Sequence, residues 1–297
     1  MEKFSLNIGK DKITFGINNI KFLLGTNYIK KDLIVNNIKK HFYKNEDSDY
    51  AIENEFKSSF KINDKQINHR QYELIEVNNQ FDLNEEQKLK TKSIFTKLLE
   101  STFLNIEYNG IVNTISILND DLANHMNEQL KNFTTKYDID IEFEDLVIKN
   151  IIKRVELNFL KDESKINQYD LNYNDKIINQ IEIITKIAEL NLSKKYLLIV
   201  EIPKVTKEIY NSLLVVKQEN VKILVCSNDE KIYENNIDIK NILSVEKQVI
   251  DLSDDVSVYN NIVMNMGIHS TMKETELMLM DYFTKNGQDV NKIGEIL

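Results

Sequence analysis

Cysteine is nearly absent from this chain, and its scarcity sets a first limit. The 297 residues contain one cysteine, Cys226, so no disulfide can form within the chain and a reducing compartment suits it. Cys226 ends the apolar stretch 221–226, a pattern that indicates a buried cysteine in a strand rather than a nucleophile.

Long apolar runs are missing as well. No stretch approaches the roughly 20 apolar residues that a membrane-spanning helix needs. The beginning of the chain, 1–12, lacks the apolar core of a secretory signal peptide. We therefore expect a soluble, cytoplasmic protein without a membrane partner.

The sequence also lacks the usual catalytic signatures. It has no G-x-S-x-G, no H-E-x-x-H and no paired C-x-x-C. The histidines, which are scattered without the spacing of metal ligands, are His41, His69, His125 and His269. We interpret each of them as a surface or core side chain, and we expect a protein that is not an enzyme.

Charge is abundant and unevenly spread. The net charge is −9, yet residues 1–45 hold nine lysines against three acidic residues, and residues 226–297 hold six lysines against thirteen. The overall acidity argues against loose binding to nucleic acid, but a local basic surface can still bind it.

Apolar periodicity predicts an α/β fold. Alternating apolar residues over 4–17 predict a β-hairpin, and further apolar runs predict strands at 20–24, 72–77, 196–202, 221–226 and 248–252. A helix predicted over 209–218 lies between two of these strands, which implies a right-handed βαβ crossover.

The segment between the strands has helical periodicity. Four amphipathic helices are expected, marked by Leu89 to Phe103, Ile111 to Phe133, Val147 to Phe159, and Ile177 to Ala188. The second has the spacing of a coiled-coil seam, and it fits both helix packing within one subunit and pairing between subunits.

These patterns predict four regions. An α/β head comprises 1–82 and 193–255, a helical leg of 83–192 is inserted in it, and an acidic helical extension follows at 256–297. The stripe formed by Leu277, Met280 and Phe283 in the extension is expected to pack against the body.

The stretch from Ile20 to Phe42 has the frame of a nucleotide-binding P-loop: a strand, a glycine turn and a helix. Gly25 and Lys31 match the pattern G-x-x-x-x-G-K-[ST]. Lys30 stands where the second glycine belongs, and Asp32 replaces the magnesium-binding hydroxyl. A lysine side chain would obstruct the backbone cradle for phosphate, and a carboxylate would repel it. The stretch therefore fits a decayed P-loop and also an ordinary strand–turn–helix.

Glu201 ends the apolar run 196–202, as the acidic residue of a Walker B strand does. Many α/β strands end in an acidic residue without holding a metal.

A cluster of carboxylates occupies 138–145. The alternation of acidic and apolar residues there places Asp138, Asp140, Glu142 and Glu144 on one side. Such oxygen ligands suit Ca²⁺, which takes six to eight of them. Glu144 and Asp145 also fit the N-terminus of a following helix, where they would oppose its dipole.

The order of these features resembles the Csn-type accessory proteins of type II-A CRISPR adaptation modules. The likeness covers most of residues 1–250 and rests on a strand pair, a degraded P-loop, a helical insertion, the acidic stretch Ile139 to Asp145, the strand 194–200 and a further strand ending in Cys226 to Asp229. It implies a degenerate P-loop-like head without nucleotide hydrolysis. It also implies a helical leg that pairs subunits into a homotetrameric ring, with Ca²⁺ ordering the leg and double-stranded DNA ends entering the ring.

The resemblance also implies the site residues. The metal candidates that match its acidic stretch are Asp140, Glu142, Glu144 and Asp145. Asn150 stands where a further carboxylate is expected. The extension beyond about Val256 exceeds the family's short form. The basic residues expected to contact DNA phosphates are Lys131, Lys136, Lys149, Lys153 and Arg154, together with an N-terminal patch that includes Lys30, Lys31, Lys39 and Lys40.

Three hypotheses follow. The first is a DNA-end-binding ring that acts in spacer acquisition with the adaptation integrase and the effector nuclease, with Ca²⁺ and without nucleotide. The second is a P-loop NTPase with a coiled-coil insertion, in which Lys31 and Glu201 act on nucleotide. The third is a coiled-coil scaffold without a nucleic-acid role.

Overall fold

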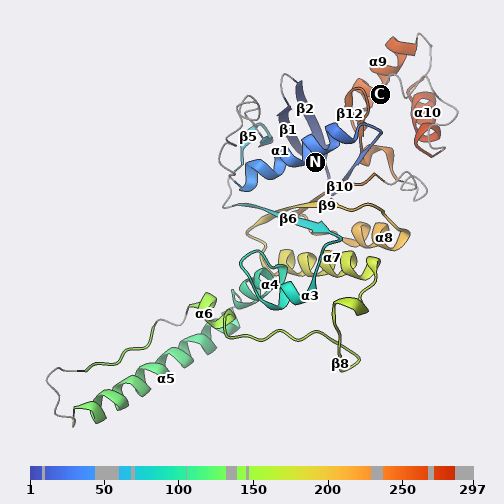
Figure 1. Cartoon of the computed structure of the whole chain (residues 1–297). Coiled ribbons are helices and arrows are strands. Elements are labelled where there is room, and N and C mark those ends of the chain that lie inside the picture. The colour runs from blue at the N-terminus through green and yellow to red at the C-terminus, as the bar shows by residue number, and fades with distance from the viewer. Residues whose placement is uncertain are drawn as a thin grey trace. The chain divides into compact units, whose positions relative to one another are not determined.

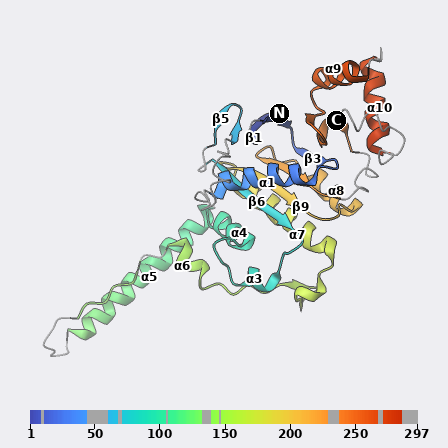
Figure 2. The same ribbon diagram turned by 45° about the horizontal axis from the view of Figure 1, so that its top comes forward.

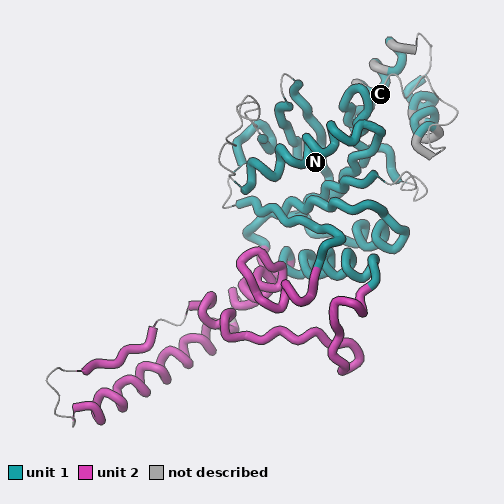
Figure 3. The backbone as a smooth tube through the Cα atoms, viewed as in Figure 1, with its two compact units in different colours: residues 1–81, 172–188, 192–297 teal, residues 82–171, 189–191 magenta. Residues whose placement is uncertain are grey.

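A computed structural model describes residues 1–8, 11–43, 60–67, 71–104, 106–131, 139–144, 147–228, 237–266 and 271–284. The chain forms two compact units (Figure 3). Unit 1 comprises residues 1–81, 172–188 and 192–297, and unit 2 comprises 82–171 and 189–191. The predicted domain boundaries stay a prediction.

A six-stranded sheet forms the centre of unit 1. Its strands, in spatial order, are β12 (Val249–Asp251), β11 (Ile242–Val245), β3 (Ile20–Leu24), β10 (Val221–Cys226), β9 (Lys195–Glu201) and β6 (Tyr72–Asn78). The five strands from β11 to β6 run parallel, and only β12 is antiparallel to its neighbour. Every residue of β3 is buried, as is typical of a central strand covered on both faces. The fold is therefore mixed α/β, as the sequence predicts.

The predicted strands are present, and some strands were missed. The crossover from β9 through α8 (Lys207–Val215) to the parallel strand β10 is confirmed. Of the predicted strand 248–252, only the three residues of β12 form a strand, which pairs antiparallel with β11. Strand β11 and the short strands β4 (Phe60–Ile62) and β5 (Lys65–Gln66) are not predicted from the sequence.

The N-terminal hairpin belongs to a second sheet, with strand order β2-β1-β4-β5. Strands β1 (Glu2–Ile8) and β2 (Asp11–Ile17) pair antiparallel, as predicted. The ring of Phe4 stacks on the rings of Phe15 and Phe60, with centroids 5.7 and 5.9 Å away. This aromatic contact links all three longer strands of the second sheet.

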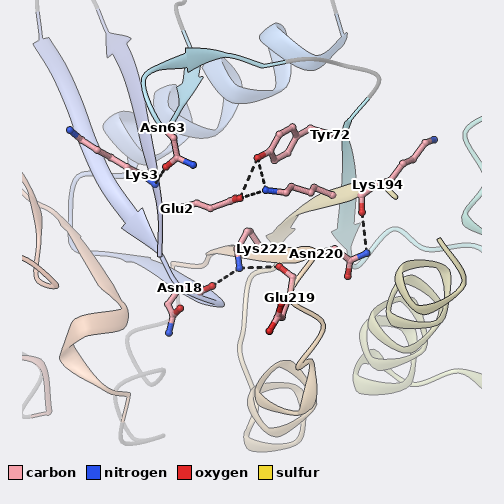
Figure 4. Close-up of polar contacts among 10 residues, drawn as sticks. Glu2, Lys3, Asn18, Asn63, Tyr72, Lys194, Glu219, Asn220 and Lys222 are labelled. Atoms are coloured by element: carbon pink, nitrogen blue, oxygen red, sulfur yellow. Dashed lines mark hydrogen bonds and ion pairs between the residues drawn. The ribbon is translucent and has the colours of Figure 1, made fainter. Parts of the chain in front are cut away.

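Lys195, the first residue of β9, joins the two sheets through Glu2 and Tyr72, both of which are labelled in Figure 4. The ammonium of Lys195 lies 2.6 Å from the carboxylate of Glu2 and 3.2 Å from the hydroxyl of Tyr72. Glu2 begins β1, whereas Tyr72 begins β6. The hairpin is thereby tied to the edge of the parallel sheet.

Helices cover both faces of the parallel sheet. Figure 1 shows α1 (Tyr28–Tyr43) on one side of β6 and β9, with α7 (Tyr173–Leu190) and α8 on the other. Strand alternation divides β9 between these faces: Leu197 and Ile199 join the core cluster that contains Ile34 of α1. The predicted helix 177–188 is confirmed as α7, whose marker residues Ile177 to Ala188 are buried.

The described C-terminal part of unit 1 contains η3 (Ile239–Asn241), α9 (Asp255–Met266) and α10 (Met272–Thr284). The predicted stripe on the last helix is wrong in its one described side chain, because Leu277 is 55% exposed. Thr275 and Leu279, which are one turn apart, are buried instead.

Unit 2 is mostly helical. Its elements are α3 (Leu83–Gln87), α4 (Ile94–Phe103), α5 (Ile106–Leu130), α6 (Ile148–Ile152), β7 (Leu160–Lys161), β8 (Ser164–Lys165) and η1 (Gln168–Asp170). The helix predicted from Leu89 to Phe103 is confirmed as α4 over Ile94–Phe103, but it does not reach back to Leu89. Leu89 has a left-handed φ of 46°, and Ser93 caps a new helix by accepting a hydrogen bond from the Thr96 amide.

The third predicted helix, marked by Val147 to Phe159, is also shorter than expected. Only the five residues of α6 are helical, and residues 153–159 form a turn followed by irregular chain before β7. Phe159 packs against Phe95 of α4 with ring centroids 4.9 Å apart. The second predicted helix is confirmed as α5 over its described residues, with Phe133 outside them.

In the part of the chain that the structure describes, every helix is too short or too polar to cross a lipid bilayer.

Candidate functional sites

The turn after β3 is the region that resembles a P-loop. Gly25 has φ +126°, a conformation that side-chain-bearing residues rarely adopt. A Cβ atom at Gly25 would lie 2.5 Å from the carbonyl oxygen of Val245, the last residue of β11. The glycine is therefore required for close approach of the chain's own backbone.

A carboxylate of the protein fills this turn. The side chain of Glu246, which is 6% exposed, accepts a hydrogen bond of 3.0 Å from the Thr26 amide and another from the Thr26 hydroxyl. The amide side chain of Asn27 donates to the backbone oxygen of Glu246 at 3.1 Å. In a P-loop, backbone amides of this turn hold phosphate. Here the Thr26 amide holds Glu246.

The lysine that matches the P-loop pattern is buried. Lys31 is 1% exposed, and its Nζ donates to the backbone oxygen of Ser227 at 3.1 Å. The same Nζ lies 4.8 Å from the centre of the Tyr28 ring, a cation–π contact. Burial lowers the pKa of Lys31, although neighbouring acidic groups, including Glu246, oppose that shift. The predicted DNA contact at Lys31 is corrected on this ground, because its charge does not reach the surface.

The residues on either side of Lys31 lie differently. Lys30 keeps its side chain 20% exposed and its Nζ lies 3.8 Å from Asp11. Asp32 is exposed. Lys30 and Asp32 therefore do not restore the second glycine and the magnesium-binding hydroxyl that the P-loop pattern has at their positions.

Glu201, the Walker B candidate, belongs to a charge cluster at the carboxyl ends of two strands. Its carboxylate accepts a hydrogen bond from Lys39 of α1, and Lys39 also lies 2.6 Å from Glu76 of β6. Burial lowers the pKa of Lys39, but the hydrogen bonds to Glu201 and Glu76 outweigh burial and raise it. Glu76 also accepts a 2.5 Å hydrogen bond from Tyr43. An ammonium thus lies between the two carboxylates.

Cys226 ends β10 and lies opposite Glu201 in the pairing of β10 with β9. It is 8% exposed, as the sequence predicts for a buried strand cysteine. Burial raises the pKa of its thiol to about 11, and a thiol in that state is a poor nucleophile at neutral pH.

The acidic segment lies in unit 2, where residues 139–144 run back along α5 (Figure 2). Asn127 of α5 holds the segment through two hydrogen bonds with the backbone of Ile141, at 2.7 and 2.9 Å. Asp140, Glu142 and Glu144 are all exposed. The fourth predicted ligand, Asp145, lies outside the described residues.

Two of these carboxylates share a pocket with two of the predicted basic residues. The open pocket has a volume of about 460 Å³, and it is lined by Asn119, Glu142, Phe143, Glu144, Asn150, Lys153 and Arg154. The structure therefore brings Glu142 and Glu144 of the acidic segment together with Lys153 and Arg154, which directly follow α6. Asp140 does not line this pocket.

The structure describes four of the five basic residues of unit 2 that are predicted to contact DNA. Lys131 and Lys149 are exposed, as are Lys153 and Arg154 of the pocket. Lys136 lies outside the described residues. Exposure leaves these four side chains accessible to phosphate, which a buried lysine is not.

The donor set of the pocket partly fits a hard cation. Two carboxylates and the amide oxygens of Asn119 and Asn150 are oxygen ligands of the kind that Ca²⁺ prefers. Among the described residues, however, no group of three or more His, Cys, Asp or Glu side chains converges as a metal site. The cations Lys153 and Arg154 line the same pocket and would compete with a metal for Glu142 and Glu144.

The sequence does not single out Asn119 or Glu246 for these sites, and it marks Asn150 only as the place of a missing carboxylate. Asn119 lies on the predicted seam helix without any motif. Glu246 follows β11, which was itself missed. The parallel register Ser244↔Leu24 places Glu246 beside Thr26, and no local sequence signal reports that pairing.

Comparison with known proteins identifies a solved structure with a similar fold, but it does not identify a family. No family model matches the sequence. No curated protein matches it either. Among solved structures, the crystal structure of Stu0660 of Streptococcus thermophilus is similar, with a TM-score of 0.70 over 96% of this chain and 86% of that chain. The two sequences are 17% identical, and at that level the likeness shows a shared fold.

Proposed function

We propose that this protein binds double-stranded DNA, at its ends, without cutting it. The observation that carries the proposal is the group of exposed basic residues around the acidic segment of unit 2: Lys131, Lys149, Lys153 and Arg154. Contacts from Lys and Arg to phosphates release counterions and need no base recognition. A chain with a net charge of −9 would bind through such a local surface.

Calcium is proposed as the cation of the same region. Glu142 and Glu144 would hold it, with Asn150 as a neutral oxygen donor, and Asp140 and Asp145 are further candidates. A bound cation would neutralise the carboxylates that lie beside Lys153 and Arg154. The local potential would then become more positive, which favours the approach of DNA.

A homotetrameric ring is the proposed assembly. Exposed apolar side chains on α5, which has 25 residues, support pairing between subunits, since Leu118 and Leu122 are 60% and 51% exposed. An exposed apolar stripe on a helix is typical of an interaction surface. A ring of such subunits would admit the end of a linear duplex.

The head is proposed as a degenerate P-loop-like domain without nucleotide chemistry. The buried position of Lys31 and the carboxylate of Glu246 in the turn support this proposal. In the rival NTPase, Lys31 would contact nucleotide phosphates and Glu201 would hold a metal, but here both groups pair within the protein.

The biological role proposed on the resemblance to Csn-type accessory proteins is spacer acquisition in CRISPR adaptation. The expected partners are the adaptation integrase and the effector nuclease. The shared fold with Stu0660 is compatible with this proposal and carries no function by itself.

A gel-shift experiment tests the proposal. A linear duplex and the same sequence as a closed circle are each titrated with protein, in Ca²⁺ and in chelator. We expect strong retardation of the linear form in Ca²⁺, weaker retardation in chelator, and almost none of the circle. Equal binding to both forms would contradict end binding, and turnover of ATP that is lost in Lys31→Ala would favour the NTPase.

A further inference from the structure

The contact between Glu246 and the turn after β3 joins parts of the chain that are 220 residues apart. The Thr26 amide and the Thr26 hydroxyl both donate to the same carboxylate oxygen, Oε2. The backbone joins in, because the Asn27 amide donates to the carbonyl of Val245 at 3.2 Å. The carboxylate therefore occupies this turn and accepts from the Thr26 amide, one of the backbone donors that a P-loop turn offers to an anion.

The space around this carboxylate is limited. A Cβ atom at Gly25 would lie 2.9 Å from Oε1 of Glu246, so the carboxylate lies directly against the glycine. Glu246 is 6% exposed, and Lys31 is 1% exposed. Phosphate could enter the turn only if Glu246 moved out.

A residue of the C-terminal extension also interacts with Glu246. Tyr282 of α10 hydrogen-bonds with the Glu246 side chain. Burial, followed by the charge of Glu246 and this hydrogen bond, raises the pKa of Tyr282 to about 12. The phenol therefore stays protonated at neutral pH and can donate to the carboxylate. Helix α10 is also anchored by Thr275 and Leu279, which are 2% and 3% exposed.

We propose that the Glu246 carboxylate occupies the turn after β3 and excludes phosphate from it, which we call the closure. We also propose that Tyr282 of the C-terminal extension keeps Glu246 in this position, and we call this contact the latch. The inference goes beyond DNA binding and does not depend on it. It assigns a role to the extension: the extension keeps the Glu246 carboxylate in the turn after β3, where a P-loop would hold phosphate.

Hydrogen exchange tests the latch. In Tyr282→Phe the carboxylate loses one donor, so we expect faster exchange at the Thr26 and Asn27 amides and in α10. The loss of a hydrogen bond to a charged group corresponds to about a tenfold change. Tyr169→Phe is the matched control, because Tyr169 is 93% exposed in unit 2, and its exchange pattern should equal that of the wild type.

Phosphate binding tests the closure. Inorganic phosphate is titrated into the wild type, Glu246→Ala and Glu246→Gln, and binding is followed by calorimetry and by the shift in Tm. We expect no binding to the wild type, measurable binding to Glu246→Ala and weaker binding to Glu246→Gln, which keeps the side-chain volume. The Gln variant serves if the Ala variant does not fold, and exposed Glu156→Ala is the control.

Two results would overturn the inference. The first is phosphate binding to the wild type that equals binding to the Glu246 variants. The second is unchanged exchange at Thr26 and in α10 in Tyr282→Phe, together with no phosphate binding in either Glu246 variant. Gel shifts with linear duplex should be equal for wild type and Tyr282→Phe, so a failure of DNA binding is distinguished from a failure of the latch.

Discussion

At the scale of single residues, Lys21 and Asp251 form an ion pair that lies largely out of solvent. Lys21 is 1% exposed, and its Nζ lies 2.7 Å from the Asp251 carboxylate, which also accepts a hydrogen bond from the Gly16 amide. Removing one partner of a buried pair leaves an uncompensated charge.

The corresponding prediction is a large loss of stability in Asp251→Ala. We expect the free energy of unfolding to fall by about 3–5 kcal/mol, measured by urea denaturation. Asp255→Ala is the control, because Lys240 and Asp255 form a pair whose side chains are each 53% exposed, and its loss should cost at most about 1 kcal/mol. Equal losses in the two variants would contradict the account.

Lys31 gives a second prediction, for which pH dependence is the measurement. Burial lowers its pKa in the folded chain below the value of 10.5 that it has when exposed. Between these two pKa values the unfolded chain binds more protons, so this residue makes stability rise with pH in that window. In Lys31→Met we expect stability within about 1 kcal/mol of the wild type at neutral pH.

The same variant should show a smaller rise of stability as the pH approaches 10.5. Urea denaturation over this pH range compares it with the wild type. Lys21, whose pKa burial also lowers, is present in both proteins and cancels in the comparison. An undiminished rise in Lys31→Met would show that Lys31 is not buried as a charged group.

At the scale of elements, the turn between β3 and α1 depends on its glycine. Gly25→Ala would combine a φ of +126° with a contact of 2.5 Å to a backbone oxygen that cannot swing aside. We expect the free energy of unfolding to fall by about 1–3 kcal/mol.

Gly110→Ala is the matched control for that change. Gly110 lies in α5, and a Cβ atom there would meet nothing within 4 Å. Because glycine is unfavourable inside a helix, we expect a gain of about 0.5–1 kcal/mol. Thermal unfolding of both variants in parallel checks the pair, and a stabilised Gly25→Ala would refute the role assigned to the turn.

Elements with a long, clean apolar pattern were predictable, and those set by distant contacts were not. The sequence predicts β9, β10 and α7 because each has a run or stripe that is buried throughout. Strand β11 has only four residues, and its place beside β3 is fixed by a register that spans the chain. Helix α6 is shorter than predicted, and Phe159 packs on Phe95 instead of extending the helical stripe.

The candidate sites follow the same rule. Local composition indicates the acidic segment, because five carboxylates fall within the eight residues 138–145, and it shows basic residues on either side of that segment. It does not indicate that Glu142 and Lys153 line one pocket, since that depends on how α6 lies against the segment. Nor does it indicate that Glu246 fills the turn at Thr26, which needs the sheet order.

At the scale of the whole molecule, the exposed stripe of α5 predicts an assembly that can be disrupted without unfolding. In Leu118→Glu with Leu122→Glu, we expect smaller particles by analytical ultracentrifugation and an unchanged circular dichroism spectrum. Both side chains are more than half exposed, so charge there costs the isolated chain little. Asn124→Glu, at an exposed position two residues along the helix, should leave the particle size unchanged. Oligomers that survive the double change would exclude this stripe as the interface.

The last prediction concerns how DNA affinity depends on salt. If Lys153 and Arg154 each neutralise one phosphate, removing both should reduce the slope of log K against log salt by about 2 and weaken binding alike for all sequences. The measurement is a titration of linear duplex at several salt concentrations with Lys153→Ala/Arg154→Ala. Lys65→Ala is the control, because it removes an exposed lysine of unit 1 and changes the net charge by the same sign. A double variant with reduced affinity but an unchanged slope would mean that these residues act on the fold or on the assembly. Equal slopes in all three proteins would place the DNA surface elsewhere on the molecule.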